Sequence, residues 1–106
     1  MIKAIFYKSG GAFRGFEIKG HSGYGEEGRD IVCAAVSSAA YMTANTITDV
    51  IGIDAEITTE DGYMKIITGS DSPEIQALYK GLLLHVKSLA EDYEGYIFCR
   101  QKLIKE

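Results

Sequence analysis

The chain has 106 residues, 46% of them hydrophobic and 25% charged, which is enough for one domain with a modest core. The net charge of −4 argues against a direct nucleic-acid partner, and no apolar run approaches the roughly 20 residues of a membrane span. The chain has two cysteines and two histidines, and they show no recognisable zinc spacing. We therefore expect no disulfide framework, no metal site and no bound cofactor.

Two strands and a glycine-rich loop are predicted first. Residues 2–8 are rich in β-branched and aromatic types, and residues 13–19 alternate apolar with charged side chains, so both segments favour strands. Ser9-Gly10-Gly11 between them predicts a turn and hence a hairpin. Residues 20–28 contain four glycines without apolar periodicity, which predicts a mobile loop.

The N-terminal segment is too short and too charged for a signal peptide, so we expect a cytoplasmic protein.

A long helix is predicted from Asp30 to about Ile51, ending at Gly52. Asp30 is a suitable N-cap, and alanine and serine dominate the interior of the segment. Because little charge appears anywhere around this helix, we expect it to be buried on most sides. It would lie either in the centre of the domain or partly covered by a second subunit.

A hairpin, a second helix and a last strand follow. Residues 53–58 alternate as a half-buried strand, residues 60–62 predict a turn, and residues 63–68 the return strand. Ser72-Pro73 begins an amphipathic helix that ends at Gly95, and residues 96–101 form the last strand. The order ββαββαβ predicts a single α+β domain over residues 1–106, a mostly antiparallel sheet with two helices packed on it.

One stretch, H-S-G-Y-G-E-E-G-R-D-I-V-C, combines a histidine with a cysteine in the first turn of a helix. The partial positive charge of a helix N-terminus favours the thiolate, which is the nucleophilic form of Cys33. His21 would be the general base beside it, and the helix N-terminal amides would stabilise an oxyanion. The alternatives are that Cys33 is a small core residue and that His21 is an ordinary loop histidine.

Three further features surround this pair. Asp30 either caps the helix or orients His21 in the manner of a catalytic triad. Ser37 follows Cys33 by one turn and shares its helix face, so it would line the same pocket or simply allow close packing. Gly23, Gly25 and Gly28 would form a mobile lid that orders on substrate; a phosphate-binding loop is rejected, because the lysine motif is missing and Glu26 and Glu27 would repel phosphate.

The motif G-H-S-G-Y-G…G-R-D-I-V-C-A-A-V-S resembles the ribosomal-processing cysteine proteases called Prp. The resemblance implies that the chain removes an N-terminal extension from bacterial large-subunit ribosomal protein twenty-seven, in bacteria whose version of it carries one. It assigns catalysis to His21 and Cys33, supporting roles to Asp30 and Ser37, and a homodimeric state to the protein. The substrate partner would be the N-terminal peptide segment of that ribosomal protein, and the resemblance implies a cut after a hydrophobic, aromatic-containing segment of the extension.

Two other functions remain open from the residues alone. The first is a non-catalytic peptide-binding module for ribosome assembly, in which Cys33 would be unreactive and His21 dispensable. The second, a thiol redox protein, is weaker because Cys99 is remote from Cys33 in the sequence.

Overall fold

The computed structural model describes residues 1–104, which form five strands and two α-helices. In chain order the elements are β1 (Ile2–Ser9), β2 (Ala12–Lys19), α1 (Ile31–Asn45), a π-helical turn η1 (Thr46–Ile51), β3 (Ala55–Glu60), β4 (Tyr63–Thr68), α2 (Pro73–Asp92) and β5 (Ile97–Leu103). The predicted order ββαββαβ is confirmed.

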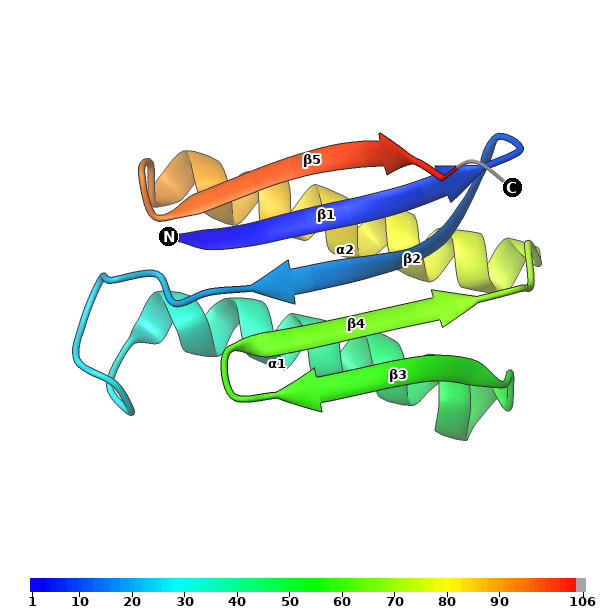
Figure 1. Cartoon of the computed structure of the whole chain (residues 1–106), viewed down its shortest axis with the longest axis horizontal. Coiled ribbons are helices and arrows are strands. Elements are labelled where there is room, and N and C mark those ends of the chain that lie inside the picture. Colours follow the sequence, from blue (N-terminus) through cyan, green and yellow to red (C-terminus); the bar gives the residue numbers. More distant parts are fainter. Residues whose placement is uncertain (105–106) are drawn as a thin grey trace.

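The five strands form one mixed sheet in the order β3-β4-β2-β1-β5. The pairings β1–β2, β2–β4 and β3–β4 are antiparallel, and β1–β5 is parallel. Both α-helices lie against the same face, with α2 behind β5, β1 and β2 and α1 behind β4 and β3 (Figure 1). The opposite face of the sheet is left open, and the prediction of a mostly antiparallel α+β fold is confirmed.

The core lies between the sheet and the two helices and is rich in aromatic side chains. Phe6 and Phe16 on neighbouring strands are fully buried, and the ring of Tyr79 from α2 meets Phe16 edge-on at 6.2 Å. Burial of each such ring contributes about 1.5–3 kcal/mol to folding. The Tyr79 hydroxyl is paired with Thr68 at 2.8 Å, and burial raises the pKa of this phenol.

The position expected for the first helix is wrong in part. α1 buries one stripe, formed by Val32, Val36, Ala40 and Ala44, against the sheet, while Met42 on its other side is 65% exposed. α1 lacks charged residues because small and hydroxylated side chains occupy its open side, not because the helix is buried on every side. The stretch Ile31–Ile51 is apolar and long enough to cross a membrane by length and composition, but here it packs on the sheet as a core helix.

The first strand of the second hairpin also differs from its prediction. It runs from Ala55 to Glu60 rather than over residues 53–58, and its side chains are mostly exposed rather than half buried. The reason is its position, because β3 is an edge strand that pairs only with β4. At the other edge, β5 continues to Leu103, two residues past its predicted end.

Candidate active site

Three consecutive segments and one remote turn meet at one end of the sheet (Figure 1). They are the end of β2, the glycine-rich loop over residues 20–30, the start of α1, and the turn between β3 and β4. This end contains every residue that the sequence assigned to the site.

Cys33 is the third residue of α1 and is half buried. The backbone N–H of Ser22 donates a hydrogen bond to Cys33 Sγ over 3.3 Å. Ser22 directly follows His21, so this contact brings the two ends of the glycine-rich loop together and places the histidine segment beside the sulfur.

Asp30 is the N-cap of α1, and both of its carboxylate oxygens are engaged. Oδ1 accepts the backbone N–H groups of Val32 and Cys33, each at 3.0 Å. Oδ2 accepts the hydroxyl of Ser22 and, at 3.3 Å, the backbone N–H of Gly25. The Ser22 hydroxyl above all, helped by these backbone donors, holds the pKa of Asp30 well below its usual range.

This pattern decides between two roles that the sequence left open. Asp30 caps the helix and ties the loop to it, and its oxygens are filled by donors other than His21. The expectation that helix N-terminal amides would hold an oxyanion is also wrong for Val32 and Cys33, because Asp30 already accepts their N–H groups. The amide at the sulfur is instead that of Ser22.

His21 is exposed and lies against the turn between β3 and β4. A Cβ atom added to Gly62 would lie 2.8 Å from His21 Nε2, and the backbone N–H of Gly20 donates to the Gly62 carbonyl at 2.9 Å. Gly62 has φ +68°, a backbone conformation that also favours glycine. The absence of a side chain at this position therefore leaves the room that the imidazole occupies.

Two cavities flank the pair, with volumes of about 420 and 370 Å³. Both are lined by the same five residues, namely His21, Glu27, Gly28, Cys33 and Ser37. The larger is lined by apolar side chains from the sheet and α1 and by Tyr41; the smaller is lined by the glycine-rich loop and the start of α1. The structure therefore brings His21, Cys33 and Ser37 together at one hollow surface.

The glycine-rich loop is fastened at its first half. Tyr24 packs edge-on against Tyr93 at 5.4 Å and Tyr96 at 5.2 Å, and the Gly25 N–H donates to Asp30. Gly23 and Gly28 adopt positive φ angles of 76° and 84°. The second half, from Glu26 to Arg29, is exposed and forms a turn in which Arg29 N–H donates to the Glu26 carbonyl.

Three contributors escaped the sequence reasoning. Ser22 was passed over as part of the loop, although it is only 4% exposed and bonds both Asp30 and the cysteine. Gly62 carried only a turn signal, and Tyr24 carried none. The local sequence held a clue for Ser22 alone, as a hydroxyl placed a short loop before a capping aspartate.

The remaining cysteine and histidine lie elsewhere. Cys99 in β5 is partly buried against the core, and burial raises the pKa of its thiol. His85 lies exposed on α2. Both lie away from the two cavities and supply internal controls for Cys33 and His21.

Comparison with known proteins gives consistent relatives. A family model described as cysteine protease Prp matches residues 1–98. A ribosomal processing cysteine protease Prp from Bacillus subtilis (strain 168) is 28% identical over 86 residues, covering 74% of this chain and 77% of the relative. Its namesake from Staphylococcus aureus strain Mu50 is 29% identical over 81 residues, covering 74% of this chain and 76% of the relative.

Two crystal structures are similar over nearly the whole chain. That of an essential ribosomal processing protease Prp from S. aureus, with a covalently linked product peptide, has a TM-score of 0.89 at 25% identity, covering 96% of this chain and 100% of that one. That of SMU.848 from Streptococcus mutans has a TM-score of 0.80 at 32% identity, covering 98% and 96%.

Proposed function

The chain belongs to the Prp family of cysteine proteases, and from this premise we propose that it removes the N-terminal extension of bacterial large-subunit ribosomal protein twenty-seven. Cys33 is the proposed nucleophile and His21 the proposed base. The observation that carries this assignment is that both residues line the same two cavities. The backbone N–H of Ser22, the residue directly after His21, also donates to Cys33 Sγ.

The proposed mechanism follows from the groups around the sulfur. His21 accepts the Cys33 proton, and the thiolate attacks the scissile carbonyl carbon. The oxyanion that forms is adjacent to the sulfur, so the Ser22 N–H, which already donates to Sγ at 3.3 Å, is the nearest backbone donor for it. His21 then protonates the leaving amine, and water hydrolyses the thioester to release the acid and regenerate the thiol.

The larger cavity is the proposed site for the apolar, aromatic-containing segment of the substrate. Ile18, Val36 and Met64 line it with apolar side chains, and Tyr41 of α1 adds an aromatic ring. Aromatic rings favour edge-on and offset contacts with such neighbours. Glu27 and Gly28 line both cavities, so movement of this half of the loop would open or cover Cys33, which supports the proposed lid role for Gly28. Gly23 and Gly25 lie in the fastened half and would act as its hinge side.

A homodimer in the cytoplasm remains part of this proposal. The open side of α1 carries Met42 and the adjoining η1 carries Val50, which are 65% and 78% exposed. Apolar side chains this exposed on one helical stretch favour cover by a second subunit. Sedimentation of the protein with and without Met42→Glu would test it: a dimer that this charge does not weaken contradicts α1 as the interface.

The function is tested by cleavage of a peptide that spans the N-terminal junction of the ribosomal protein. Cys33→Ser and His21→Ala should abolish cleavage while thermal unfolding stays close to that of the wild type. Cys99→Ser and His85→Ala are the matched controls, because each makes the same chemical change away from the cavities. Full activity of Cys33→Ser, or binding of the peptide by the wild type without cleavage, would favour the non-catalytic module instead.

A further inference from the structure

The fold separates basic from acidic residues. Seven of the eleven lysine and arginine residues lie in β1, β2, β4 and β5, whereas these four strands hold one of the fifteen carboxylate residues, Glu17. The net charge of −4 is therefore the sum of a basic sheet and an acidic remainder. A negative net charge argues against a nucleic-acid partner only where the charged residues are spread evenly over the surface, and here they are not.

The basic residues gather on the open face of the sheet. Ala4 and Phe6 are fully buried under the helices, so their neighbours along β1 point to the open face. The strand register extends this face sideways, since Lys3 pairs with Lys19 and with Phe98. We call this surface the basic sheet face, and its cations are Lys3, Lys19, Lys65, Arg100 and Lys102.

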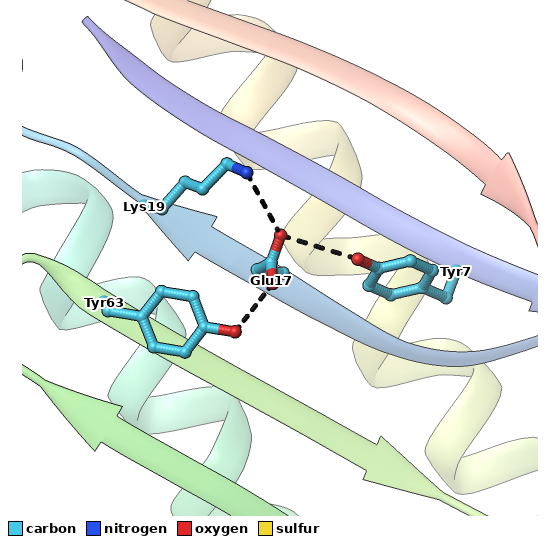
Figure 2. Close-up of polar contacts among 4 residues, drawn as sticks. All are labelled: Tyr7, Glu17, Lys19 and Tyr63. Atoms are coloured by element: carbon cyan, nitrogen blue, oxygen red, sulfur yellow. Dashed lines mark hydrogen bonds and ion pairs between the residues drawn. The ribbon is translucent and has the colours of Figure 1, made fainter.

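The carboxylate in the middle of this face is already occupied, and the other two, Glu56 and Glu60, lie at its edge on β3. Glu17 accepts hydrogen bonds from Tyr63 at 2.7 Å and Tyr7 at 3.5 Å, and its Oε1 lies 3.8 Å from Lys19 Nζ, as Figure 2 shows. Only 12% of its side chain is exposed, whereas 48% of the Lys19 side chain is exposed. The potential outside the β5, β1 and β2 part of the face, which is remote from β3, is therefore set by the cations.

Aromatic rings lie among these cations. Phe98 is 49% exposed beside Lys3, its partner in the parallel pairing. Lys65 Nζ lies 5.3 Å from the centre of the Tyr7 ring. Binding of an acidic protein would require only the cations. An exposed ring among cations on an open sheet is suited to a nucleic acid, because the ring can stack on a nucleobase while the cations contact phosphates.

We propose that the basic sheet face binds single-stranded RNA. The proposal goes beyond the protease assignment and does not rest on it, because the face lies on the side of the sheet opposite α1, which carries Cys33. An RNA contact there would hold the molecule beside a ribonucleoprotein substrate while the cavities remain accessible.

The test is titration of a fluorescently labelled, mixed-sequence single-stranded RNA of about 12 nucleotides with the full chain, followed by anisotropy at several salt concentrations. The face variant is Lys3→Glu with Arg100→Glu. The matched control is Lys80→Glu with Lys87→Glu, which makes the same change in net charge at two exposed positions of α2. Thermal unfolding and peptide cleavage are measured for each variant, so that loss of RNA binding is distinguished from loss of folding or of proteolysis.

The face variant should bind RNA at least about tenfold more weakly, and its salt slope should fall by about 1.4, the value for two lost phosphate contacts. The control should stay within about twofold of the wild type. Phe98→Ala should weaken RNA binding about tenfold yet leave binding of poly-glutamate unchanged, because only RNA offers bases to stack.

Three results would overturn the proposal. One is an absence of salt-dependent RNA binding by the wild type, and another is an equal loss in the face and control variants. The third is binding of poly-glutamate as tight as that of RNA and indifferent to Phe98→Ala, which would identify an acidic protein as the partner.

Discussion

The hydroxyl of Ser22 donates to Oδ2 of Asp30, the same carboxylate whose Oδ1 caps α1 at Cys33. One side chain thereby joins the histidine segment, the glycine-rich loop and the helix that carries the cysteine. The geometry between His21 and Cys33 depends on this junction rather than on a direct contact of Asp30 with the imidazole.

Replacing Ser22 with alanine tests this junction. The variant loses a buried hydroxyl bonded to a carboxylate, so we expect the loop to shift at His21 and kcat/KM for the junction peptide to fall about tenfold, equivalent to ~1.4 kcal/mol. Ser38→Ala, at an exposed serine of α1, is the control and should keep wild-type activity. Equal rates for the two variants would contradict a positioning role for Ser22.

The lowered pKa of Asp30 predicts a specific loss of stability in acid. A carboxyl group whose folded pKa is depressed stabilises the fold fully above its unfolded pKa of about 3.9, and this contribution is lost as the pH falls toward the folded value. Denaturant unfolding at several pH values should show Asp30→Ala less stable than the wild type at neutral pH, with the difference shrinking below about pH 4.

Asp30→Ser separates the cap from the charge, because serine is a good N-cap that does not titrate in this range. This variant should retain more of the neutral-pH stability than Asp30→Ala and should lack the loss below about pH 4. A wild-type pH profile in Asp30→Ser would assign the acid sensitivity to other groups.

Gly62→Ala should impair catalysis more than it impairs folding. The added methyl would lie 2.8 Å from His21 Nε2, so the imidazole must move from its place in the cavity. Gly10→Ala carries a similar backbone penalty at φ +59°, while its Cβ meets no atom of residues 1–104 within 4 Å. We expect similar losses of thermal stability in the two variants, with kcat about tenfold or more lower in Gly62→Ala alone. Matching kcat values would show that the contact with His21 is unimportant.

Alkylation distinguishes Cys33 from Cys99 in one molecule. Iodoacetamide should label Cys33 rapidly at neutral pH, and His21→Ala should slow this reaction while leaving Cys99 unchanged. Burial raises the pKa of the Cys99 thiol, which makes it the slow internal reference. The experiment is repeated with the junction peptide bound; equal labelling of the two cysteines in both states would contradict an activated nucleophile.

The hydrogen bond from Tyr63 to Glu17 on the open face predicts a raised phenol pKa that a titration can measure. The hydrogen bond to Glu17 raises the pKa of Tyr63 to about 12. Because this folded pKa is raised, its stabilising contribution is complete below the usual tyrosine pKa of about 10 and is lost as the pH rises through about 12. Ultraviolet difference titration should place the Tyr63 pKa nearer 10 in Glu17→Gln. Glu56→Gln on β3 should leave it near the wild-type value.

The elements could be predicted where local chemistry determines them. Ser72-Pro73 begins α2, Asp30 caps α1, and residues 63–68 form β4 as their alternation predicts. The depth of burial could not be predicted in the same way. Residues 53–58 alternate like a half-buried strand, but β3 lies at the edge of the sheet, which only the order of the strands determines.

The site was predictable in composition and not in its contacts. His21, Cys33 and Ser37 are brought to shared cavities, as the motif indicates. The role of Asp30 depends on which donors reach its oxygens, and Gly62 acts on His21, a partner far along the chain. Such partners have no signature in one sequence, because they are set by how the loop and the hairpin fold back on α1.

If His21 is the base we propose, the closeness of Gly62 to His21 makes the edge hairpin part of the catalytic apparatus. β3 is largely exposed and bonds to one neighbour, so we expect the β3–β4 pair to open locally at a lower free energy than global unfolding. Such opening would remove the wall behind the imidazole while the helices and the central strands stay folded. The free energy of this local opening is smaller than that of global unfolding, so mild denaturant would lower activity before the molecule as a whole unfolds.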